Sequence, residues 1–191
     1  MISAVPESVK NLKGRHRVSA LSRLAREIAG LSSMKSGVSG MRFEKDETGV
    51  PRPFGRIFWS ISHKPGLVGG VVARTPVGID IETMRPVSGR LFERVVAPEE
   101  MEWFDEPDRD LIFFRTFTAK EAVLKRFGRG IESLSRVRVT GREGKEGLIL
   151  AFENEKIRVV HFYLDDHIAS VTKELPDIHW TVEKSTVKNN F

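Results

Sequence analysis

Apolar side chains recur along the chain with two periods, one typical of helices and the other typical of strands. In residues 15–31 and 111–127 they fall three or four positions apart, which places them on one face of a helix. Asp105 or Asp108 is suited to cap the start of the second helix, and Gly128 is suited to end it. On the first helix, the face expected to be buried consists of Val18, Leu21, Leu24, Ala25 and Ile28.

Shorter apolar runs bounded by turn residues predict the strands. In the first half we expect strands at 41–44, 56–62, 67–73 and 77–82, and in the second at 137–139, 148–152, 157–164 and 168–171. Short polar turns separate the later runs, which indicates an antiparallel meander. Helical spacing over 91–96 predicts a short helix, and Pro98 suits the first position of another. Helix followed by strands occurs in each half, so the predicted class is α+β, with a boundary near residue 97.

Composition places the chain among ordinary globular proteins. It has 191 residues, of which 40% are hydrophobic, and this is enough for a real core. The absence of cysteine excludes disulfides, thiolate metal sites and cysteine nucleophiles. No apolar run approaches the roughly 20 residues needed to span a bilayer, and residues 1–7 do not have the pattern of a signal peptide. We therefore expect a soluble cytoplasmic protein.

The net charge of +5 favours an anionic partner. Nucleic acid, a phosphate-rich cofactor and an acidic protein all fit this charge. The basic face of the first helix, with Arg15, Arg17, Arg23 and Arg26, fits the same partners, although a solvated helix face has the same pattern.

The first candidate for chemistry is the run Val-Gly-Ile-Asp-Ile-Glu at 77–82. Side chains alternate along a strand, so Asp80 and Glu82 would share one face. Two neighbouring carboxylates repel each other unless a cation offsets the charge, and their oxygens suit a hard ion such as Mg²⁺. A strand with one face in water presents the same pattern, so this pair of acids alone does not distinguish a metal site from a solvent-exposed strand.

The second candidate lies on the later helix. Glu121 and Lys125 are four residues apart and share a helix face, with Lys120 beside them. By itself the pair is also typical of an exposed helical ion pair.

Together these stretches resemble the 4'-phosphopantetheinyl transferases. The resemblance is carried by Gly-Ile-Asp-Ile-Glu at 78–82, by Phe-Thr-Ala-Lys-Glu-Ala-Val-Leu-Lys at 117–125 and by Trp-Ser-Ile-Ser-His at 59–63. The motifs stand in the order of that family, and the resemblance covers about residues 15–170. The length resembles the larger Sfp-type monomers more than the short trimeric type.

The resemblance implies a fold and a reaction. The fold is two similar α+β halves related by a pseudo-two-fold axis, here residues 1–97 and 98–191, with the active site between them. The reaction transfers phosphopantetheine from coenzyme A to a serine of an acidic apo acyl or peptidyl carrier protein, depends on Mg²⁺ and releases 3',5'-ADP. A monomer with no nucleic-acid or membrane partner is expected.

The resemblance also implies roles for particular residues. It makes Asp80, Glu82 and Glu121 the metal ligands, and Glu121 with Lys125 the catalytic pair. The residues expected to bind coenzyme A are Arg17, Arg23, Lys45, Ser62, His63, Lys120 and Lys125. Where relatives carry a lysine in the turn that follows Lys45, this chain has Val50, so Lys45 or Arg52 would supply the charge.

Two other classes of function fit part of the pattern. A metal-dependent nuclease or phosphodiesterase would also use acids in a basic protein, but we find no further acidic or histidine motif for it. A basic module that binds RNA or an acidic protein is the other alternative. Tyr163 is the only tyrosine, and no stacking motif for bases is present. The sequence does not identify the carrier protein.

Overall fold

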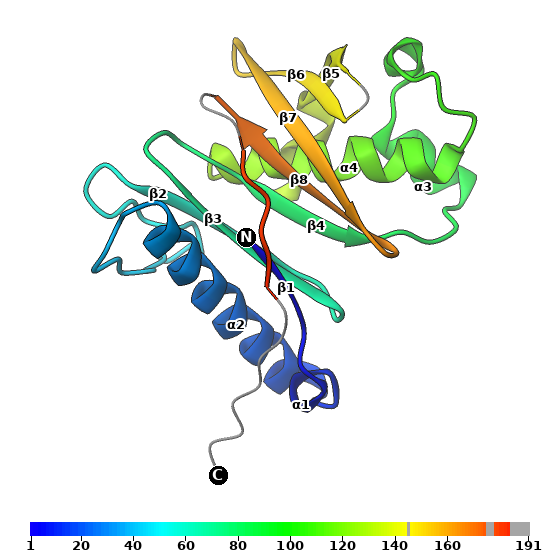
Figure 1. The fold of residues 1–191 in the computed structure, drawn as a ribbon. Helices are drawn as coiled ribbons and strands as arrows, with labels where there is room; N and C mark the ends of the chain where they lie inside the picture. The colour runs from blue at the N-terminus through cyan, green and yellow to red at the C-terminus, as the bar shows by residue number, and fades with distance from the viewer. Residues whose placement is uncertain (145, 175–177, 184–191) are drawn as a thin grey trace.

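The structure, a computed structural model, describes residues 1–144, 146–174 and 178–183. Its helices are α1 (Glu7–Lys10), α2 (Gly14–Lys35), α3 (Gly89–Val95) and α4 (Arg109–Arg126), with 3₁₀ turns η1 (Pro98–Trp103) and η2 (Ile131–Arg136). Its strands are β1 (Ile2–Ala4), β2 (Phe58–His63), β3 (Leu67–Ala73), β4 (Ile79–Thr83), β5 (Arg138–Glu143), β6 (Gly147–Phe152), β7 (Glu155–Leu164), β8 (His167–Lys173) and β9 (Val182–Glu183). The chain is thus α+β, as predicted (Figure 1).

The first sheet has the strand order β2-β3-β1-β9. Strands β2 and β3 form the predicted hairpin, closed by the turn at residues 64–66. Strand β1 was not predicted, because only three residues at the N-terminus form it, yet it lies between β3 and β9. Strand β9 runs parallel to β1, so residues near both ends of the chain meet in one sheet.

The second sheet has the order β4-β8-β7-β6-β5. Strands β5 to β8 form the predicted antiparallel meander. Strand β4, which we expected in the first half, instead pairs antiparallel with β8, Asp80 lying opposite Ser170. The sheets therefore do not separate at residue 97, and the proposed division of the chain there stays a prediction.

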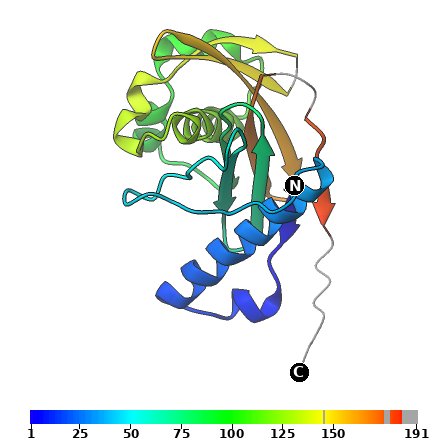
Figure 2. The same ribbon diagram turned by 90° about the vertical axis from the view of Figure 1, so that its left-hand side faces the viewer.

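Each sheet is covered by one long helix (Figure 1). Helix α2 packs on β2 and β3, while α4, viewed end-on in Figure 2, packs on β4 and β8. Glycines permit both contacts: a Cβ on Gly70 would press on the Ala29 backbone, and one on Gly78 would overlap the Ala122 carbonyl. The sheets also share core, because Ile2 and Leu67 pack with Ile81 and Ala169.

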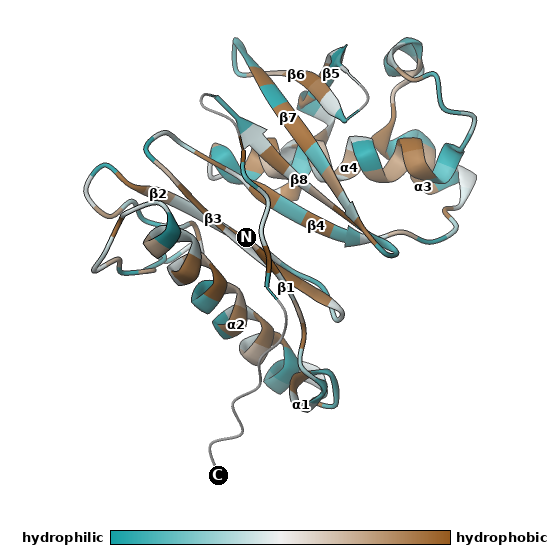
Figure 3. Cartoon of the chain, viewed as in Figure 1, coloured by the Kyte–Doolittle hydropathy of each residue, from teal (hydrophilic) through white to brown (hydrophobic). Residues whose placement is uncertain are grey.

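The two long helices differ in burial, although both carry hydrophilic and hydrophobic residues (Figure 3). Helix α4 is buried over most of its length, whereas α2 has a polar face in solvent. The predicted stripe on α2 is correct for Leu21, Ala25 and Ile28, but Val18 is 56% exposed because it precedes the sheet contact. Among the described helices, none is long and apolar enough to cross a membrane.

Local details test the remaining predictions. Asp108 caps α4, its carboxylate accepting hydrogen bonds from the amides of residues 110 and 111, and Gly128 follows the helix with a φ of 62°. The prediction of a strand at 41–44 is wrong, because this segment is irregular. It leads into a turn in which the Asp46 carboxylate accepts hydrogen bonds from the amides of Thr48 and Val50. The polar tail at 184–190 lies outside the described residues.

Candidate active site

The Ser-Ile-Ser stretch of β2 lies along the free edge of β4. One edge of β4 pairs with β8, and the amides of Ile79 and Ile81 point to the other edge. They donate to the hydroxyls of Ser60 and Ser62, at 3.2 and 3.1 Å. Because alternate residues of a strand face the same way, a serine at every second position of β2 matches every second amide of β4. The serine spacing therefore fixes the position of the Asp80 strand.

Asp80 is the centre of this arrangement and is buried, with an exposed fraction of 5%. Its Oδ1 atom accepts a hydrogen bond from Ser62 Oγ at 2.9 Å and one from Lys125 Nζ at 2.7 Å. The same ammonium donates to the Ile79 carbonyl at 3.0 Å, so Lys125 links α4 to β4. The second carboxylate oxygen of Asp80, Oδ2, is buried and has no hydrogen-bond partner in the structure.

Glu121 lies one helical turn before Lys125 on α4. Burial, and then the negative charge of Asp80, raise the pKa of Glu121 to about 7, with Lys125 opposing the shift. Its Oε1 atom is also buried and has no hydrogen-bond partner within the described residues. A carboxyl group with a pKa near neutrality exchanges protons readily at physiological pH.

Glu82 is placed differently from the other two acids. Its Oε1 atom lies 2.7 Å from Lys64 Nζ, in an ion pair whose side chains are 17% and 33% exposed. Burial raises the pKa of Glu82, and the hydrogen bond from Lys64 partly offsets that effect. Two of the predicted metal ligands thus pair with a lysine, Glu82 with Lys64 and Asp80 with Lys125.

Several basic groups surround the acids. Burial lowers the pKa of His63, and the positive charges of Lys125, Lys45 and Lys64 lower it further. Burial also lowers the pKa of Lys45, with contributions from Arg26 and Lys125. Cations that disfavour one another's charge at close range are stabilised by an anion placed among them. These groups come from α2, the 45–51 turn, the end of β2 and α4, which shows that the fold gathers them.

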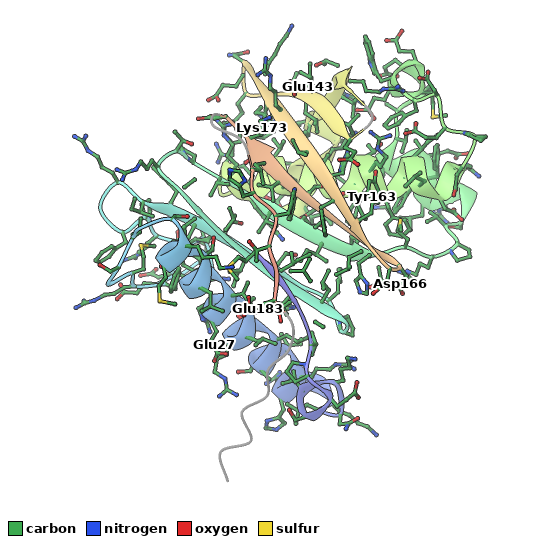
Figure 4. The ribbon with its side chains drawn as sticks, viewed as in Figure 1. Glu27, Glu143, Tyr163, Asp166, Lys173 and Glu183 are labelled. Carbon is green, nitrogen blue, oxygen red and sulfur yellow. The ribbon has the colours of Figure 1, made fainter. Side chains whose placement is uncertain are left out.

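Two predicted coenzyme A residues, Lys120 and Arg23, lie away from this cluster, whereas Ser62 contacts Asp80. The ammonium of Lys120 is buried in the opposite direction, where it donates to Glu100 and to the Val95 carbonyl, each at 2.8 Å. The hydroxyl of Ser62 is engaged with Asp80, so Ser62 orients that carboxylate. Arg23 is 75% exposed beside Glu27, which Figure 4 shows on the outer side of α2.

Arg26 is the basic residue of α2 that sequence reasoning passed over. It is half-buried and acts electrostatically on Lys45. Arg17 and Arg26 both line a shallow hollow along α2. The signal in the sequence was the spacing of Arg15 and Arg26, which are eleven residues, or about three helical turns, apart and so share one helix face.

The acids fit a divalent cation in part. The unpartnered buried oxygens of Asp80 and Glu121 are hard ligands, and a cation near both would offset the repulsion that raises the pKa of Glu121. In the part of the chain that the structure describes, no three His, Cys, Asp or Glu side chains form a group able to hold a metal ion. The predicted set with Glu82 is therefore not assembled. A pair of carboxylates suits Mg²⁺, which usually keeps several waters and substrate oxygens as ligands.

Comparison with protein families agrees with this arrangement. Residues 76–182 match the family model described as the 4'-phosphopantetheinyl transferase superfamily, which is more than half of the chain and includes both Asp80 and Glu121. The chain belongs to this superfamily. The match begins just before β4, so the matched region contains the whole second sheet and α4.

Individual relatives are similar over shorter stretches. The chain is 33% identical over 94 residues to the 4'-phosphopantetheinyl transferase psf-1 of Bacillus pumilus, covering 47% of this chain and 40% of the relative. It is 37% identical over 89 residues to the 4'-phosphopantetheinyl transferase HetI of a Nostoc species, covering 44% of this chain and 38% of the relative. A putative 4'-phosphopantetheinyl transferase of Haemophilus influenzae is 31% identical over 145 residues, covering 63% of this chain and 61% of the relative. The chain thus spans about two fifths to three fifths of the length of these relatives.

Proposed function

We propose that this protein transfers the phosphopantetheine group of coenzyme A to a serine of an apo carrier protein and releases 3',5'-ADP. The observation that carries the proposal is that buried Asp80 on β4 and half-buried Glu121 on α4 interact electrostatically among basic side chains. Each has a buried oxygen with no hydrogen-bond partner among the described residues. Such a site suits a substrate that brings both phosphates and a metal ion. The superfamily and the names of the Bacillus and Nostoc relatives support the same reaction.

The basic groups would bind the phosphates of coenzyme A. His63, Lys45 and Arg26 lie on the side of the first sheet and α2, and their mutual repulsion would be relieved by phosphate oxygens. Lys125, whose ammonium forms an ion pair with Asp80, would stabilise negative charge on the phosphate of 3',5'-ADP as it leaves. Positioning and charge neutralisation are the main demands of displacement at phosphorus.

Glu121 is our candidate for the base. The serine oxygen forms a bond to the phosphorus of the phosphopantetheine group, the bond from that phosphorus to the 3',5'-ADP oxygen breaks, and Glu121 accepts the serine proton directly or through water. Without a metal ion, its pKa of about 7 leaves the carboxyl partly protonated at neutral pH, and a bound Mg²⁺ would favour the ionised form. Mg²⁺ held by Asp80 and Glu121 would supply Lewis-acid chemistry and a template for the pyrophosphate when bound.

The carrier protein would approach through a groove of about 880 Å³ beside the acids. Phe113 and Phe117, whose rings stack with centroids 5.7 Å apart, line this groove together with the basic residues Lys64, Arg85 and Arg94. Two acidic residues, Glu82 and Glu132, also line the groove, so its charged residues are basic by one, and together with the apolar rings this fits an acidic carrier surface. We further propose a monomer of the Sfp type, in which α2 with its strands and α4 with its strands are pseudo-symmetric halves.

The test is mass spectrometry of an apo carrier protein incubated with this protein, coenzyme A and Mg²⁺. We expect a mass gain of one phosphopantetheine group and the release of 3',5'-ADP. Asp80→Asn should abolish the gain, while Asp165→Asn, at an exposed turn far along the chain, should leave it unchanged. No mass gain with any carrier class, combined with hydrolysis of a phosphodiester that depends on Asp80, would favour the nuclease alternative instead.

A further inference from the structure

Hydrogen bonds between buried side chains join α4 to the second sheet at the level of Asp80. Ser170 on β8 pairs with Asp80 on β4 and with His161 on β7, so these residues form one row across three strands. Cross-strand partners project from the same face of a sheet, and α4 packs on these strands (Figure 2). Ser170 Oγ lies 2.6 Å from Thr118 Oγ1 of α4 and 2.8 Å from His161 Nδ1. We call Thr118, Ser170 and His161, each 1% exposed or less, the polar chain.

The contacts of Thr118 fix the order of the protons in the polar chain. Its Oγ1 atom lies 2.7 Å from the Phe114 carbonyl, and because a carbonyl has no proton, the Thr118 hydroxyl is the donor of that bond. Thr118 therefore accepts a hydrogen bond from Ser170, which in turn accepts one from Nδ1 of His161. Burial keeps His161 neutral by lowering its pKa to about 3, so its single ring proton lies on Nδ1. Each hydroxyl thus donates one bond and accepts one, which satisfies a polar chain inside a core.

The polar chain meets α4 on the face that carries the candidate catalytic residues. Thr118 lies three residues before Glu121 and seven before Lys125, and this spacing places the three side chains on one side of the helix. Apolar packing alone leaves a helix some freedom to turn or slide on a sheet, because the hydrophobic effect has no direction. A hydrogen bond weakens when its length or angle changes, so the Thr118–Ser170 bond resists both movements.

We propose that the polar chain sets the rotation of α4 on the second sheet and thereby holds Glu121 and Lys125 beside Asp80. Thr118 and Ser170 are then positioning residues. The inference rests on the proposed function for its effect on rate, whereas its effect on the position of α4 concerns the free protein. The basic groups expected to bind the coenzyme A phosphates lie on α2, the 45–51 turn and β2, so loss of the polar chain should slow transfer more than it weakens coenzyme A binding.

The first test compares two substitutions of Thr118 in the full chain. Thr118→Val keeps the shape of the side chain and removes the hydroxyl, whereas Thr118→Ser keeps the hydroxyl and removes a methyl group. We expect Thr118→Val to lower kcat at least about tenfold and to change the KM for coenzyme A less than about threefold, because small misplacements of reacting groups cost rate. Thr118→Ser should keep kcat within about threefold of the wild-type value. Ser170→Ala breaks the polar chain from the sheet side, should resemble Thr118→Val, and replaces it if Thr118→Val does not fold.

The second test measures the position of α4 by NMR, without coenzyme A or carrier. In the wild-type protein, proton–nitrogen correlation spectra should show the ring proton of His161 on Nδ1. Nuclear Overhauser effects should join the Lys125 side chain to β4, since its ammonium lies 3.0 Å from the Ile79 carbonyl. Thr118→Val should weaken these Overhauser effects, and Thr118→Ser should preserve them.

The matched control is Ser33→Ala on α2. It removes a buried hydroxyl that donates to the Gly30 carbonyl at 2.9 Å, and it should change neither kcat nor the Overhauser effects. The proposal is overturned if His161 carries its proton on Nε2, if Thr118→Val leaves the Overhauser effects unchanged or raises KM instead of lowering kcat, or if Thr118→Ser is as impaired as Thr118→Val. The expected Overhauser changes in a protein that gives no mass gain with any carrier would support the positioning of α4 and contradict the proposed function.

Discussion

Lys125 shows how one side chain serves both the fold and the proposed chemistry. Its ammonium contacts Asp80 and the Ile79 carbonyl, so it is already aimed at the place where negative charge would develop. We expect Lys125→Ala to lower kcat about 100-fold, with a smaller effect on the KM for coenzyme A, because its charge matters most as the leaving group separates. Arg26→Ala should show the reverse. Steady-state kinetics with varied coenzyme A separates the effect on kcat from the effect on KM. An effect of Lys125→Ala on KM alone would contradict the role of Lys125 in stabilising the leaving group.

His161 is a residue whose ionisation matters for stability rather than for the site. It is buried against Ser170, and desolvation lowers its pKa from 6.5 to about 3. The unfolded chain therefore binds a proton that the folded chain does not, so stability is fully present above pH 6.5 and is lost as pH falls toward 3. We expect a slope approaching about 1.4 kcal/mol per pH unit in this window.

Urea unfolding between pH 4 and pH 8 measures that slope. His161→Gln should reduce it, while the same change at the exposed His16 on α2 should not. Equal slopes in the wild-type protein and in His161→Gln would show that other groups cause the acid sensitivity.

At the scale of elements, Lys120 joins α4 to its neighbours. Its ammonium lies 2.8 Å from Glu100, which is fully buried and also accepts the amide of Val139 at the start of β5. Removing one member of a buried ion pair leaves the other charge without compensation, so Lys120→Ala should cost about 3–5 kcal/mol of unfolding free energy. Lys156→Ala, at an exposed position, should cost almost nothing. If the Lys120→Ala protein has normal stability but binds coenzyme A weakly, Lys120 binds the cofactor, as the sequence predicted.

The contact between α4 and β4 depends on Gly78. A Cβ at this position would overlap the carbonyl of Ala122, on the helix that carries Glu121 and Lys125. We expect Gly78→Ala to destabilise the protein by about 3 kcal/mol and to lower activity, because helix and strand must move apart. Gly30→Ala is the control, since its Cβ on α2 would meet only Phe43 at 3.7 Å and a helical alanine is favourable by about 1 kcal/mol. Thermal and urea unfolding of both variants measure the difference.

For the whole molecule, the net charge of +5 and the basic residues of the groove predict how it meets an acidic carrier. Apparent affinity for the carrier should fall as added salt shortens the screening length from about 10 Å toward about 3 Å. Coenzyme A, held by half-buried cations, should be affected less. The measurement is the KM of each substrate against salt, with the other saturating. A carrier KM that does not change with salt would indicate a mainly apolar docking surface.

The sequence alone determined the main elements and the chemical candidates. Periodicity located α2, α4 and the β5–β8 meander, because each buries one face and so needs a regular apolar pattern. The resemblance carried by the motifs around Asp80, Glu121 and Lys125 singled out two acids and a lysine, which the structure brings into electrostatic contact. The Ser-Ile-Ser-His motif was also visible, and the hydroxyls of its two serines accept hydrogen bonds from the amides of β4.

Only the tertiary structure decided which groups meet. It placed β4 in the second sheet, put the three-residue β1 inside the first, and turned Lys120 toward Glu100 instead of the site. It also brought Arg26 near Lys45, left Arg23 largely exposed and paired Lys64 with Glu82. These outcomes depend on contacts between segments far apart in the chain, where the free energy of burial and charge neutralisation is settled by the neighbours that folding supplies. Local patterns predict which face of an element is buried, but they carry no information about the partner that covers it.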